Sequence, residues 1–381
     1  MVFLYINIYM SKRIRSKRFK SKKAKSKNAK SKRDYKKTMN RRRKNKIKKI
    51  NKGGSSVIGQ GSHGIVQLDE KSVRGYSRKA CFARKIAKSR LTNDRKEEFK
   101  EEFKEEFKIL KRMDHPNIVK VFRMGTGEGL YFYLEFCNAG DLSHYIKNGR
   151  AQVNDGCLED SNGFAHGTIM GGGYKTMDTD QKFFVIQGIL KGLKYIHANE
   201  YIHCDIKPGN ILLTYNSDRR HNYKFTPKIA DFGLAARSGD KKAGTNGYIP
   251  VECLVRTGKS HDYWGCGVTI LEFIWMSTDL STDYKRCIFP RDNGFNISDL
   301  IGWKDKYFGD DLRRTMSVAH ARASFRTLLC IPEHVELEEL GVEMEDNNIT
   351  LSESNERKFY EYYANIRERG FNALCGLYDT R

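Results

Sequence analysis

Residues 201–213, YIHCDIKPGNILL, and residues 228–235, KIADFGLA, decide how the fold of this chain is interpreted. They contain Asp205 and Asn210, and Asp231 follows Asn210 by 21 residues. These residue types meet the needs of phosphoryl transfer: Asp205 can accept or orient the hydroxyl proton of a substrate, while Asn210 and Asp231 supply oxygen ligands for Mg²⁺. An aspartate beside Gly or Pro more often caps a helix or a turn. The joint spacing of the three residues nevertheless favours a catalytic site.

A glycine-rich segment, GQGSHGIV, lies between two strand-like runs and contains Gly59, Gly61 and Gly64. Without side chains, such residues let backbone amides approach phosphates closely. A glycine-rich hairpin with a purely structural role is the alternative. A dinucleotide-binding loop is disfavoured, because the strand-like run IVQL follows where that loop needs a helix. Lys85, in the strand-like run ACFARKIA, could carry an amine to a phosphate or could simply be solvated.

The first half of the chain beyond residue 55 alternates apolar and polar residues in short runs, which is typical of strands. One amphipathic helix is expected among them, built on EEFK repeated three times at 97–108. Later helices are expected at DLSHYI, FFVIQGILKGLKYIH and WGCGVTILEFIW. Strands therefore dominate first, and helices follow.

Together these motifs resemble those of the eukaryotic protein kinases of the serine/threonine type, in the same order and spacing, over about residues 54–276. The resemblance implies an α+β, two-lobed protein-kinase fold that uses ATP and Mg²⁺. A small β-rich N-lobe with helix C is expected at 53–136, and a larger, mainly helical C-lobe at 137–381. Residues 148–180, rich in Gly and polar residues, are expected to be a flexible insertion. The pattern diverges after residue 276.

The resemblance also assigns the residues around ATP. Residues 59–66 become the phosphate-covering loop, and Lys85 becomes the phosphate-binding lysine. Counting back nine residues from His115 gives Glu106 as the ion-pair partner of Lys85, although Glu102 occupies the same helical column one turn earlier. The full set expected around ATP is Ile58, Gly59, Gly61, Gly64, Val66, Ala83, Lys85, Leu134, Glu135, Cys137, Asp141, Leu212 and Asp231.

Within that set, YLEFCNAGDL is similar to the hinge of the family. Leu134 is then the gatekeeper, the backbones of Glu135 and Cys137 bind adenine, and Asp141 lies near the ribose. An ordinary buried strand is the alternative for this segment, because backbone contacts cannot be read from side chains.

Downstream, GTNGYIPVE at 244–252 resembles the substrate-binding loop of the family. Lys207 and Thr245 are the residues that serine/threonine-directed kinases carry, so protein Ser and Thr hydroxyls are the expected acceptors. Lys207 can also neutralise charge on the transferring phosphate. The expected catalytic set is Lys85, Glu106, Asp205, Lys207, Asn210 and Thr245. By the same resemblance, Asp262 is the buried aspartate that supports the catalytic loop from below.

The usual H-R-D of the family is His-Cys-Asp here, with Cys204 in place of the arginine that would pair with an activation-loop phosphate. Cysteine cannot make a bidentate phosphate contact. Together with the short loop between Asp231 and Gly244, this predicts activity without activation-loop phosphorylation.

Two further departures concern the loop after the catalytic motifs and the strand of Lys85. The usual A-P-E is P-V-E, and the arginine that should pair with Glu252 cannot be assigned from the sequence. Arg84 stands where an apolar residue is common, which an outward-facing strand position tolerates. Residues 289–309 faintly resemble kinases that trigger replication origins, and this is the only basis for a cell-cycle role.

The net charge of +24 is concentrated in residues 11–52, where Asp34 is the only acid, and the rest of the chain is nearly neutral. Residues 11–35 repeat with a period of five, which matches neither helix nor strand, so 1–52 is expected to be a disordered basic tail. RRRKNKIKK favours nuclear import, and hence binding to import receptors. Nucleic acid, acidic partners, an anionic membrane or no function at all are the alternatives. Nuclear localisation is therefore expected, with a cytoplasmic or peripheral-membrane location as the alternative.

The nine cysteines are scattered, odd in number and never spaced C-x-x-C. This pattern argues against a disulfide framework or a zinc site and favours a reducing compartment. The apolar start, MVFLYINIYM, lacks a preceding basic region and a cleavage site, so a secretory signal is not expected. No later run reaches the length that spans a bilayer, so a soluble protein without a transmembrane segment is expected.

Three hypotheses follow from the sequence. The first is an active serine/threonine kinase, and the second is a pseudokinase scaffold that uses its fold and basic tail only for binding. They differ in whether a catalytic position is missing, and none is. The third, a nucleic-acid-binding protein of unrelated fold, accounts for the tail alone. The sequence leaves the oligomeric state and the substrates open.

Overall fold

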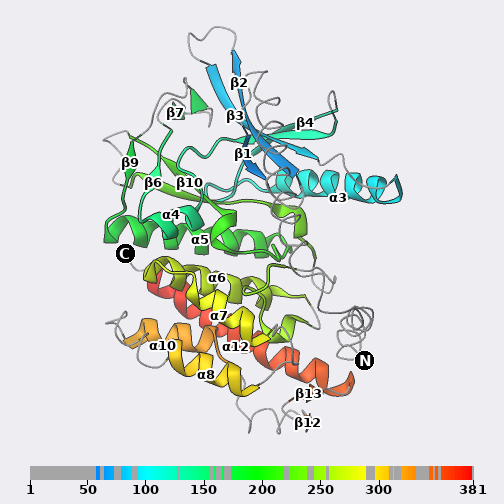
Figure 1. Ribbon diagram of the computed structural model, residues 1–381, viewed down its shortest axis with the longest axis vertical. Coiled ribbons are helices and arrows are strands. Elements are labelled where there is room, and N and C mark those ends of the chain that lie inside the picture. Colours follow the sequence, from blue (N-terminus) through cyan, green and yellow to red (C-terminus); the bar gives the residue numbers. More distant parts are fainter. Residues whose placement is uncertain are drawn as a thin grey trace, which may run out of the picture.

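This computed structural model describes residues 57–60, 64–72, 79–87, 93–126, 129–154, 158–159, 165–166, 173–217, 223–237, 244–254, 257–288, 297–308, 312, 319–331, 343–345, 348–350 and 353–379. The expected basic tail at 1–52 and Gly61 lie outside them. Within the described residues, strands gather in a small lobe and helices in a larger one (Figure 1). The expected α+β, two-lobed fold is confirmed.

Five antiparallel strands form the sheet of the small lobe in the order β1-β2-β3-β5-β4. They are β1 (Val57–Gln60), β2 (Gly64–Ser72), β3 (Lys79–Ala87), β4 (Val121–Gly125) and β5 (Tyr131–Glu135). Side chains of a strand alternate between its faces. In β3 this alternation buries Ala83 and Lys85, while Arg84 between them is half-buried and donates to Gln67 of β2 at 2.9 Å.

Helix α3 (Asn93–Arg112) contains the EEFK repeats and lies along the small-lobe sheet (Figure 1). Phe103 is buried against Phe132 of β5, with ring centroids 4.7 Å apart, and Phe107 contacts the same ring at 5.9 Å. The outer face carries Lys–Glu pairs three residues apart. Its apolar column therefore fixes the rotation of α3 and turns Glu106 inward.

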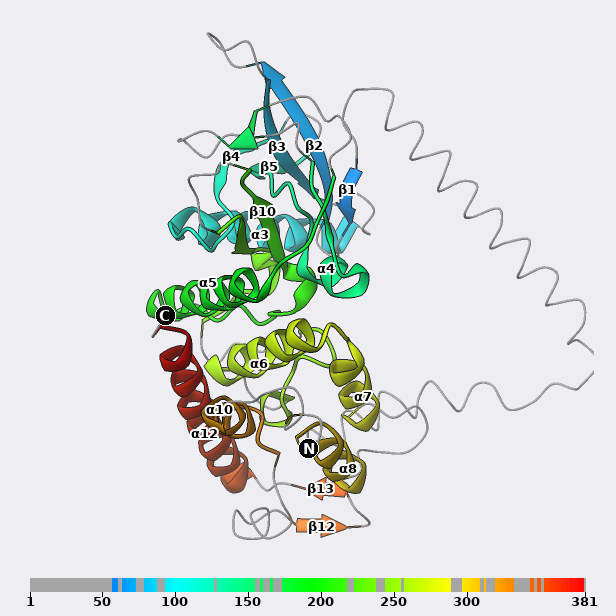
Figure 2. The same ribbon diagram turned by 90° about the vertical axis from the view of Figure 1, so that its left-hand side faces the viewer.

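The large lobe is organised around α6 (Lys259–Trp275), which is buried from Ser260 to Phe273. A helix that is buried on all sides lies at the centre of a core, and its polar side chains then need partners there. The other helices of this lobe are α4 (Leu142–Asn148), α5 (Thr179–Ala198), α7 (Asp279–Ile288), α8 (Ile297–Phe308), α10 (Ala319–Leu328) and α12 (Glu353–Asp379). In Figures 1 and 2, α5 lies on the side of α6 toward the small lobe, and α10 and α12 lie on the opposite side.

Short elements connect these helices. The strands β10 (Ile211–Tyr215) and β11 (Phe225–Ile229) form a hairpin, and β12 (Glu343–Glu345) pairs with β13 (Asn348–Thr350). The 3₁₀ turns are η2 (Pro208–Asn210), η3 (Phe232–Leu234) and η4 (Val251–Leu254). The first hairpin lies between η2 and η3, and so it brings Asn210 and Asp231 to the same edge of the lobe.

The described part of residues 148–180, expected as a flexible insertion, contains four short strands. The strand β6 (Ala151–Gln152) pairs with β9 (Tyr174–Lys175), and β7 (Leu158–Glu159) pairs with β8 (Ala165–His166). The strand β8 also extends the small-lobe sheet by pairing with β3. This is possible because β5 pairs only with Phe82 to Ile86, which leaves Ala80 and Cys81 open on that side.

The cysteine pattern argued against a disulfide framework and favoured a reducing compartment, but Cys81 takes part in a disulfide. Six other cysteines are thiols: Cys137, Cys204, Cys253, Cys266, Cys330 and Cys375. Among the described helices, none is both long enough and apolar enough to cross a membrane.

Candidate active site

Lys85 joins two acidic side chains from different parts of the chain. Its Nζ lies 2.5 Å from Oε1 of Glu106 on α3 and 2.7 Å from Oδ1 of Asp231 beyond β11. Glu102, one turn earlier on α3, is exposed. The two glutamates share one face of α3, so the position along the helix decides between them: Phe103 and Phe107, on either side of Glu106, both contact Phe132, which pairs with Lys85 across β3 and β5.

The charge of Lys85 is held by these neighbours. Burial alone would lower the pKa of Lys85, but the carboxylates of Glu106 and Asp231 outweigh burial and raise the pKa above its usual 10.5. The pKa of Glu106 is raised, chiefly by burial. The ammonium group of Lys85 opposes this rise, but it is shared with Asp231 and does not fully offset the effect of burial. Lys85 therefore keeps its positive charge, and its ammonium group links Glu106 of the small lobe to Asp231 of the large lobe.

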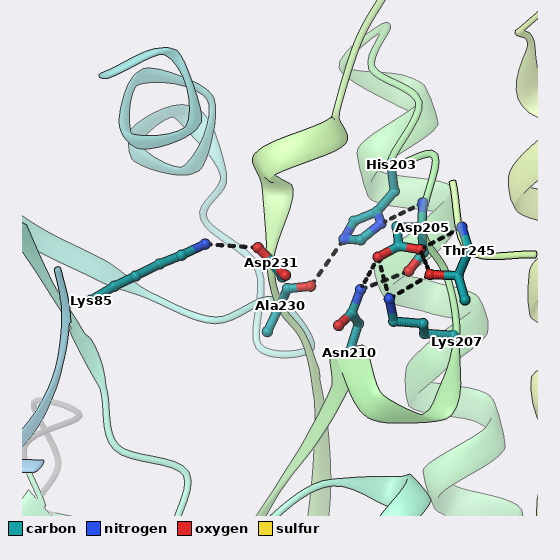
Figure 3. A network of polar contacts seen from close by, with 8 residues as sticks. All are labelled: Lys85, His203, Asp205, Lys207, Asn210, Ala230, Asp231 and Thr245. Carbon is teal, nitrogen blue, oxygen red and sulfur yellow. Dashed lines mark hydrogen bonds and ion pairs between the residues drawn. The ribbon is translucent and has the colours of Figure 1, made fainter. Parts of the chain in front are cut away.

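Asp231 has an unusual backbone conformation, with φ 65° and ψ 72°. Non-glycine residues occupy this left-handed region rarely, although Asp tolerates it better than most. Phe232 next to it is buried, and its ring meets the ring of His203 edge-on at 4.8 Å. Packing of Phe232 and the bond to Lys85 thus hold the Asp231 carboxylate toward the small lobe (Figure 3).

Asp205 is the centre of a polar network (Figure 3). Its Oδ2 accepts from Nζ of Lys207 at 2.6 Å and from Nδ2 of Asn210 at 2.9 Å. Its Oδ1 accepts from the hydroxyl of Thr245 at 2.6 Å and from the Thr245 backbone N–H at 3.1 Å. Lys207 also donates to Thr245 Oγ1 at 2.6 Å. Four of the residues selected from the sequence therefore meet at one carboxylate, which is 6% exposed.

The loop that carries Asp205 is fastened to α6 by Asp262. This buried carboxylate accepts from the backbone N–H of His203 at 2.7 Å and of Cys204 at 2.8 Å. It also accepts from Nε2 of His197 at 2.8 Å. Burial opposes ionisation, but the bond from His197 outweighs it and lowers the pKa of Asp262. Asp262 thus holds Cys204 at φ 64°, the conformation that turns the chain toward Asp205.

The apolar residues expected around adenine belong to a single core cluster that spans both lobes. Ala83 and Leu134 are buried and directly opposed in the pairing of β3 with β5. Val66 and Leu212 are partly buried against the same cluster. Ile58 is different, because 45% of it is exposed at the end of the sheet.

Of the loop glycines, Gly59 pairs with Val66 across the β1–β2 hairpin. Gly64 opens β2 directly against β3, where an added Cβ would lie 2.7 Å from the carbonyl oxygen of Ile86. The backbone there requires glycine. Gly61 is outside the described residues.

The hinge residues have side-chain roles that the sequence did not indicate. Glu135 is buried and binds two other segments: its Oε1 accepts from the backbone N–H of Lys120 at 2.7 Å and its Oε2 from Nζ of Lys228 at 2.9 Å. Cys137 is half-buried. Asp141 is the N-cap of α4, where its Oδ1 accepts from the backbone N–H of His144 at 2.8 Å. One oxygen of Asp141 is therefore committed to the helix.

The donor set near Asp205 fits Mg²⁺. Asn210 uses its Nδ2 for Asp205, which leaves its carbonyl oxygen Oδ1 as the atom for a cation. Asp231 contributes a carboxylate. Among the described residues no cluster of three or more His, Cys, Asp or Glu forms a complete metal cage. Mg²⁺ commonly takes one or two protein ligands and completes its shell with water and substrate phosphates, so a partial site is what it requires.

A family model, that of the protein kinase domain, matches residues 54–287, which is more than half of the chain. The chain belongs to the protein kinase family. Lys85, Glu106, Asp205, Asn210 and Asp231 all lie within the matched region.

Three curated kinases illustrate its relatives. It is 28% identical over 231 residues to CBL-interacting protein kinase 28 of Oryza sativa subsp. japonica, covering 57% of this chain and 43% of that protein. It is 29% identical over 223 residues to serine/threonine protein kinase OSK3 of Oryza sativa subsp. indica, covering 56% and 36%. It is 31% identical over 194 residues to MAP kinase kinase kinase wis4 of Schizosaccharomyces pombe, covering 45% and 12%. The chain thus spans less than half the length of these relatives.

In this kinase, Cys204 lies in an apolar cluster. The residue is fully buried and packs with Ile202 and Ala236, and Leu234 packs partly against them. Ile202 and Ala236 also exchange backbone hydrogen bonds at 2.8 and 2.9 Å. An apolar cluster cannot compensate the loss of hydration of a phosphate, so the side chains around Cys204 do not form a phosphate site.

The kinase also contains an arginine partner for Glu252 that sequence reasoning missed. Arg367 of α12 donates from Nε to Oε1 at 2.7 Å and from Nη2 to Oε2 at 3.0 Å, and both side chains are fully buried. A signal was present: Arg367 continues the column of Phe359 and Tyr363, four residues apart, and so it stands where an amphipathic helix carries an apolar residue.

Proposed function

We propose that this chain is an active, ATP- and Mg²⁺-dependent protein kinase that phosphorylates Ser and Thr hydroxyls of proteins. The observation that carries the proposal is the position of Lys85, which binds Glu106 and Asp231 at once. A lysine held between both lobes in this way is ready to bind ATP phosphates. Family membership supports the reaction class.

The surroundings of Asp205 support the rest of the reaction. Its carboxylate would accept or orient the proton of the acceptor hydroxyl as that oxygen attacks the terminal phosphorus of ATP. Lys207 lies 2.6 Å from Asp205 and from Thr245, close enough to offset charge on the transferred phosphoryl group. Asn210 and Asp231 would hold Mg²⁺, which when bound neutralises charge on the phosphates. The Lys207–Thr245 contact favours Ser and Thr acceptors.

A pseudokinase scaffold is the alternative. It is disfavoured because every catalytic side chain is present and those of Lys207 and Asn210 both contact the carboxylate of Asp205. The decisive test is ATP-dependent phosphorylation of a mixed Ser/Thr and Tyr peptide library by wild type and by Asp205→Asn. We expect label on Ser and Thr from wild type only. Equal label from both proteins would refute the catalytic assignment.

We further propose that the kinase needs no activation-loop phosphate, because Cys204 packs in an apolar cluster instead of presenting a cation. Phosphatase-treated protein should retain the rate of untreated protein. An inert dephosphorylated protein that regains activity with a phosphate at Ser238 or Thr245 would show the opposite.

We also propose a nuclear location, which the basic tail supports, with a cytoplasmic or peripheral-membrane location as the alternative. A cell-cycle role is proposed from the resemblance of residues 289–309 alone. The run RRRKNKIKK supports nuclear import. Deleting residues 1–52 of a fluorescently tagged protein should abolish nuclear accumulation while leaving peptide phosphorylation intact. Unchanged nuclear signal would rule out the import role.

A further inference from the structure

Tyr201, the first residue of the motif that carries Asp205, has no role in the reaction proposed above. Its side chain is 7% exposed and belongs to the main core cluster, yet its hydroxyl group contacts a cation. Nη1 of Arg112 donates to that hydroxyl at 2.9 Å. Arg112 is the last residue of α3, so this bond joins the helix that carries Glu106 to the loop that carries Asp205.

The segment after Asp231 meets the same tyrosine. The guanidinium carbon of Arg237 lies 5.8 Å from the centre of the Tyr201 ring, within the range of a cation–π contact. The neighbouring residues Ile202 and Ala236 exchange the two backbone hydrogen bonds described above. Three elements therefore meet at one side chain: helix α3, the catalytic loop and the segment that follows Asp231.

The end of α3 is held on the large lobe. Just beyond the helix, the backbone N–H of Val119 donates to the carbonyl oxygen of Ile229 in β11 at 2.9 Å, and the N–H of Ile229 donates to the carbonyl oxygen of Asn117 at 2.8 Å. Glu106 lies six residues before Arg112, which is about 9 Å along the helix axis. The direction in which α3 leaves its held end therefore sets the position of Glu106, and the bond from Arg112 restricts that direction.

Cys204 makes this contact more important than it would otherwise be. It stands at the position of the H-R-D arginine and is fully buried, so the loop has no guanidinium group there to bind an activation-loop phosphate. The bond between Arg112 and Tyr201 has a charged donor, and such hydrogen bonds are stronger than neutral ones. It links α3 to the catalytic loop without any phosphate.

We propose that Tyr201 and Arg112 are positioning residues of this kinase. Their hydrogen bond keeps α3, and with it the pair of Glu106 and Lys85, aligned with the loop of Asp205, and it does so in the absence of an activation-loop phosphate. Both residues act through these neighbours and not on the substrate. The inference rests on the proposed kinase function and adds the contact that keeps its site aligned.

The first test compares the steady-state kinetics of variants of the full chain with a Ser/Thr peptide. Tyr201→Phe and Arg112→Met should each lower kcat about three- to tenfold, the loss of one partly exposed hydrogen bond with a charged donor, and should leave the KM for the peptide within about twofold. The double variant should be no slower than either single variant, because both changes remove the same bond. Phosphatase treatment should not alter these ratios.

Two further variants serve as controls. Arg112→Lys keeps a cationic donor and should restore at least about half of the wild-type kcat. Lys111→Met should behave like wild type, since Lys111 is the exposed neighbour of Arg112 and donates to the carbonyl oxygen of Phe122 within the small lobe. Unchanged kcat in Tyr201→Phe, or losses that add in the double variant, would overturn the proposal. A fall in Tm with unchanged kcat per folded molecule would assign Tyr201 a purely structural role and would also overturn it.

Hydrogen exchange tests the same link without turnover. In Arg112→Met, the backbone amides of residues 201–205 should exchange at least about threefold faster than in wild type, although the substitution lies in the other lobe. Unchanged exchange at these amides would refute the link even in an active kinase. Faster exchange in a chain whose wild type does not phosphorylate peptides would support the link and refute the kinase function alone.

Discussion

Replacing Arg367 by methionine should destabilise the large lobe severely. The guanidinium group makes a bidentate pair with Glu252 and donates from Nη1 to the backbone carbonyls of Leu328 at 3.0 Å and Cys330 at 2.6 Å. Methionine would fill much of the volume against Trp264, whose ring lies 4.6 Å from the guanidinium carbon. It would leave Glu252 as a buried carboxylate whose one remaining hydrogen-bond partner among the described residues is Ser260.

The magnitude follows from that unpaired charge. Removing one partner of a buried ion pair costs about 3–5 kcal/mol. Natural domains have a total stability of about 5–15 kcal/mol, so the loss takes a large part of it. For a domain of this size it corresponds to a fall in Tm of roughly 6–20 °C. The pair itself contributes less than this cost, because most of the cost comes from the orphaned glutamate.

Urea unfolding followed by circular dichroism measures the effect. Arg369→Met is the control, because Arg369 is an exposed residue two positions further along the same helix, and it should cost below about 0.5 kcal/mol. The double variant Glu252→Leu with Arg367→Met should recover most of the stability, since it removes both charges together. If Arg367→Met cost no more than Arg369→Met, the buried pair would not have the importance argued here.

Three further predictions concern the active site. Glu106→Gln should lower kcat/KM about 10- to 100-fold, since about 1.5–3 kcal/mol of charged hydrogen bonding to Lys85 is lost, whereas Glu102→Gln should change nothing; equal effects would reverse their assignment. Thr245→Val should lower kcat at least about tenfold, because Asp205 loses the hydrogen bond from the Thr245 hydroxyl that orients it. Thr245→Ser keeps the hydroxyl and should retain most activity; if it were as slow as Thr245→Val, the loss would come from altered packing and not from the hydrogen bond. The folded protein lowers the pKa of Asp262 below 3.8, so the stability that its carboxylate contributes is complete above about pH 3.8 and is lost as the pH falls through the lower folded pKa. Asp262→Asn should therefore reduce the fall in the free energy of unfolding at acid pH, measured by urea unfolding at a series of pH values. An unchanged pH dependence would show that Asp262 does not contribute to it.

The sequence predicted which side chains gather around Asp205, because most of them belong to residue types at short spacing in one segment. Asp205, Lys207 and Asn210 lie within six residues, so one loop brings them together whatever surrounds it. Helices α4, α5 and α6 were also expected, from the apolar positions in DLSHYI, FFVIQGILKGLKYIH and WGCGVTILEFIW. The sequence left Glu102 and Glu106 as alternatives, since residues four apart share one helical face.

The described strands of the 148–180 insertion could not be found in the same way. Pairs such as Ala80 with His166 depend on which edge of β3 the neighbouring strand leaves open, and two-residue strands have no detectable period. The disulfide of Cys81 was hidden for a similar reason, because scattered cysteines do not indicate which of them approach each other.

By itself, the sequence determined the family, the reaction class and the residues around Asp205, since motifs within one segment need only local geometry. Only the tertiary structure decided that Glu106 is the partner of Lys85 and that Arg367 neutralises Glu252. The Arg367–Glu252 contact joins residues 115 positions apart. Such contacts are set by how buried helices pack and by the cost of leaving a charge unpaired in the core, and neither leaves a periodic signal in the chain.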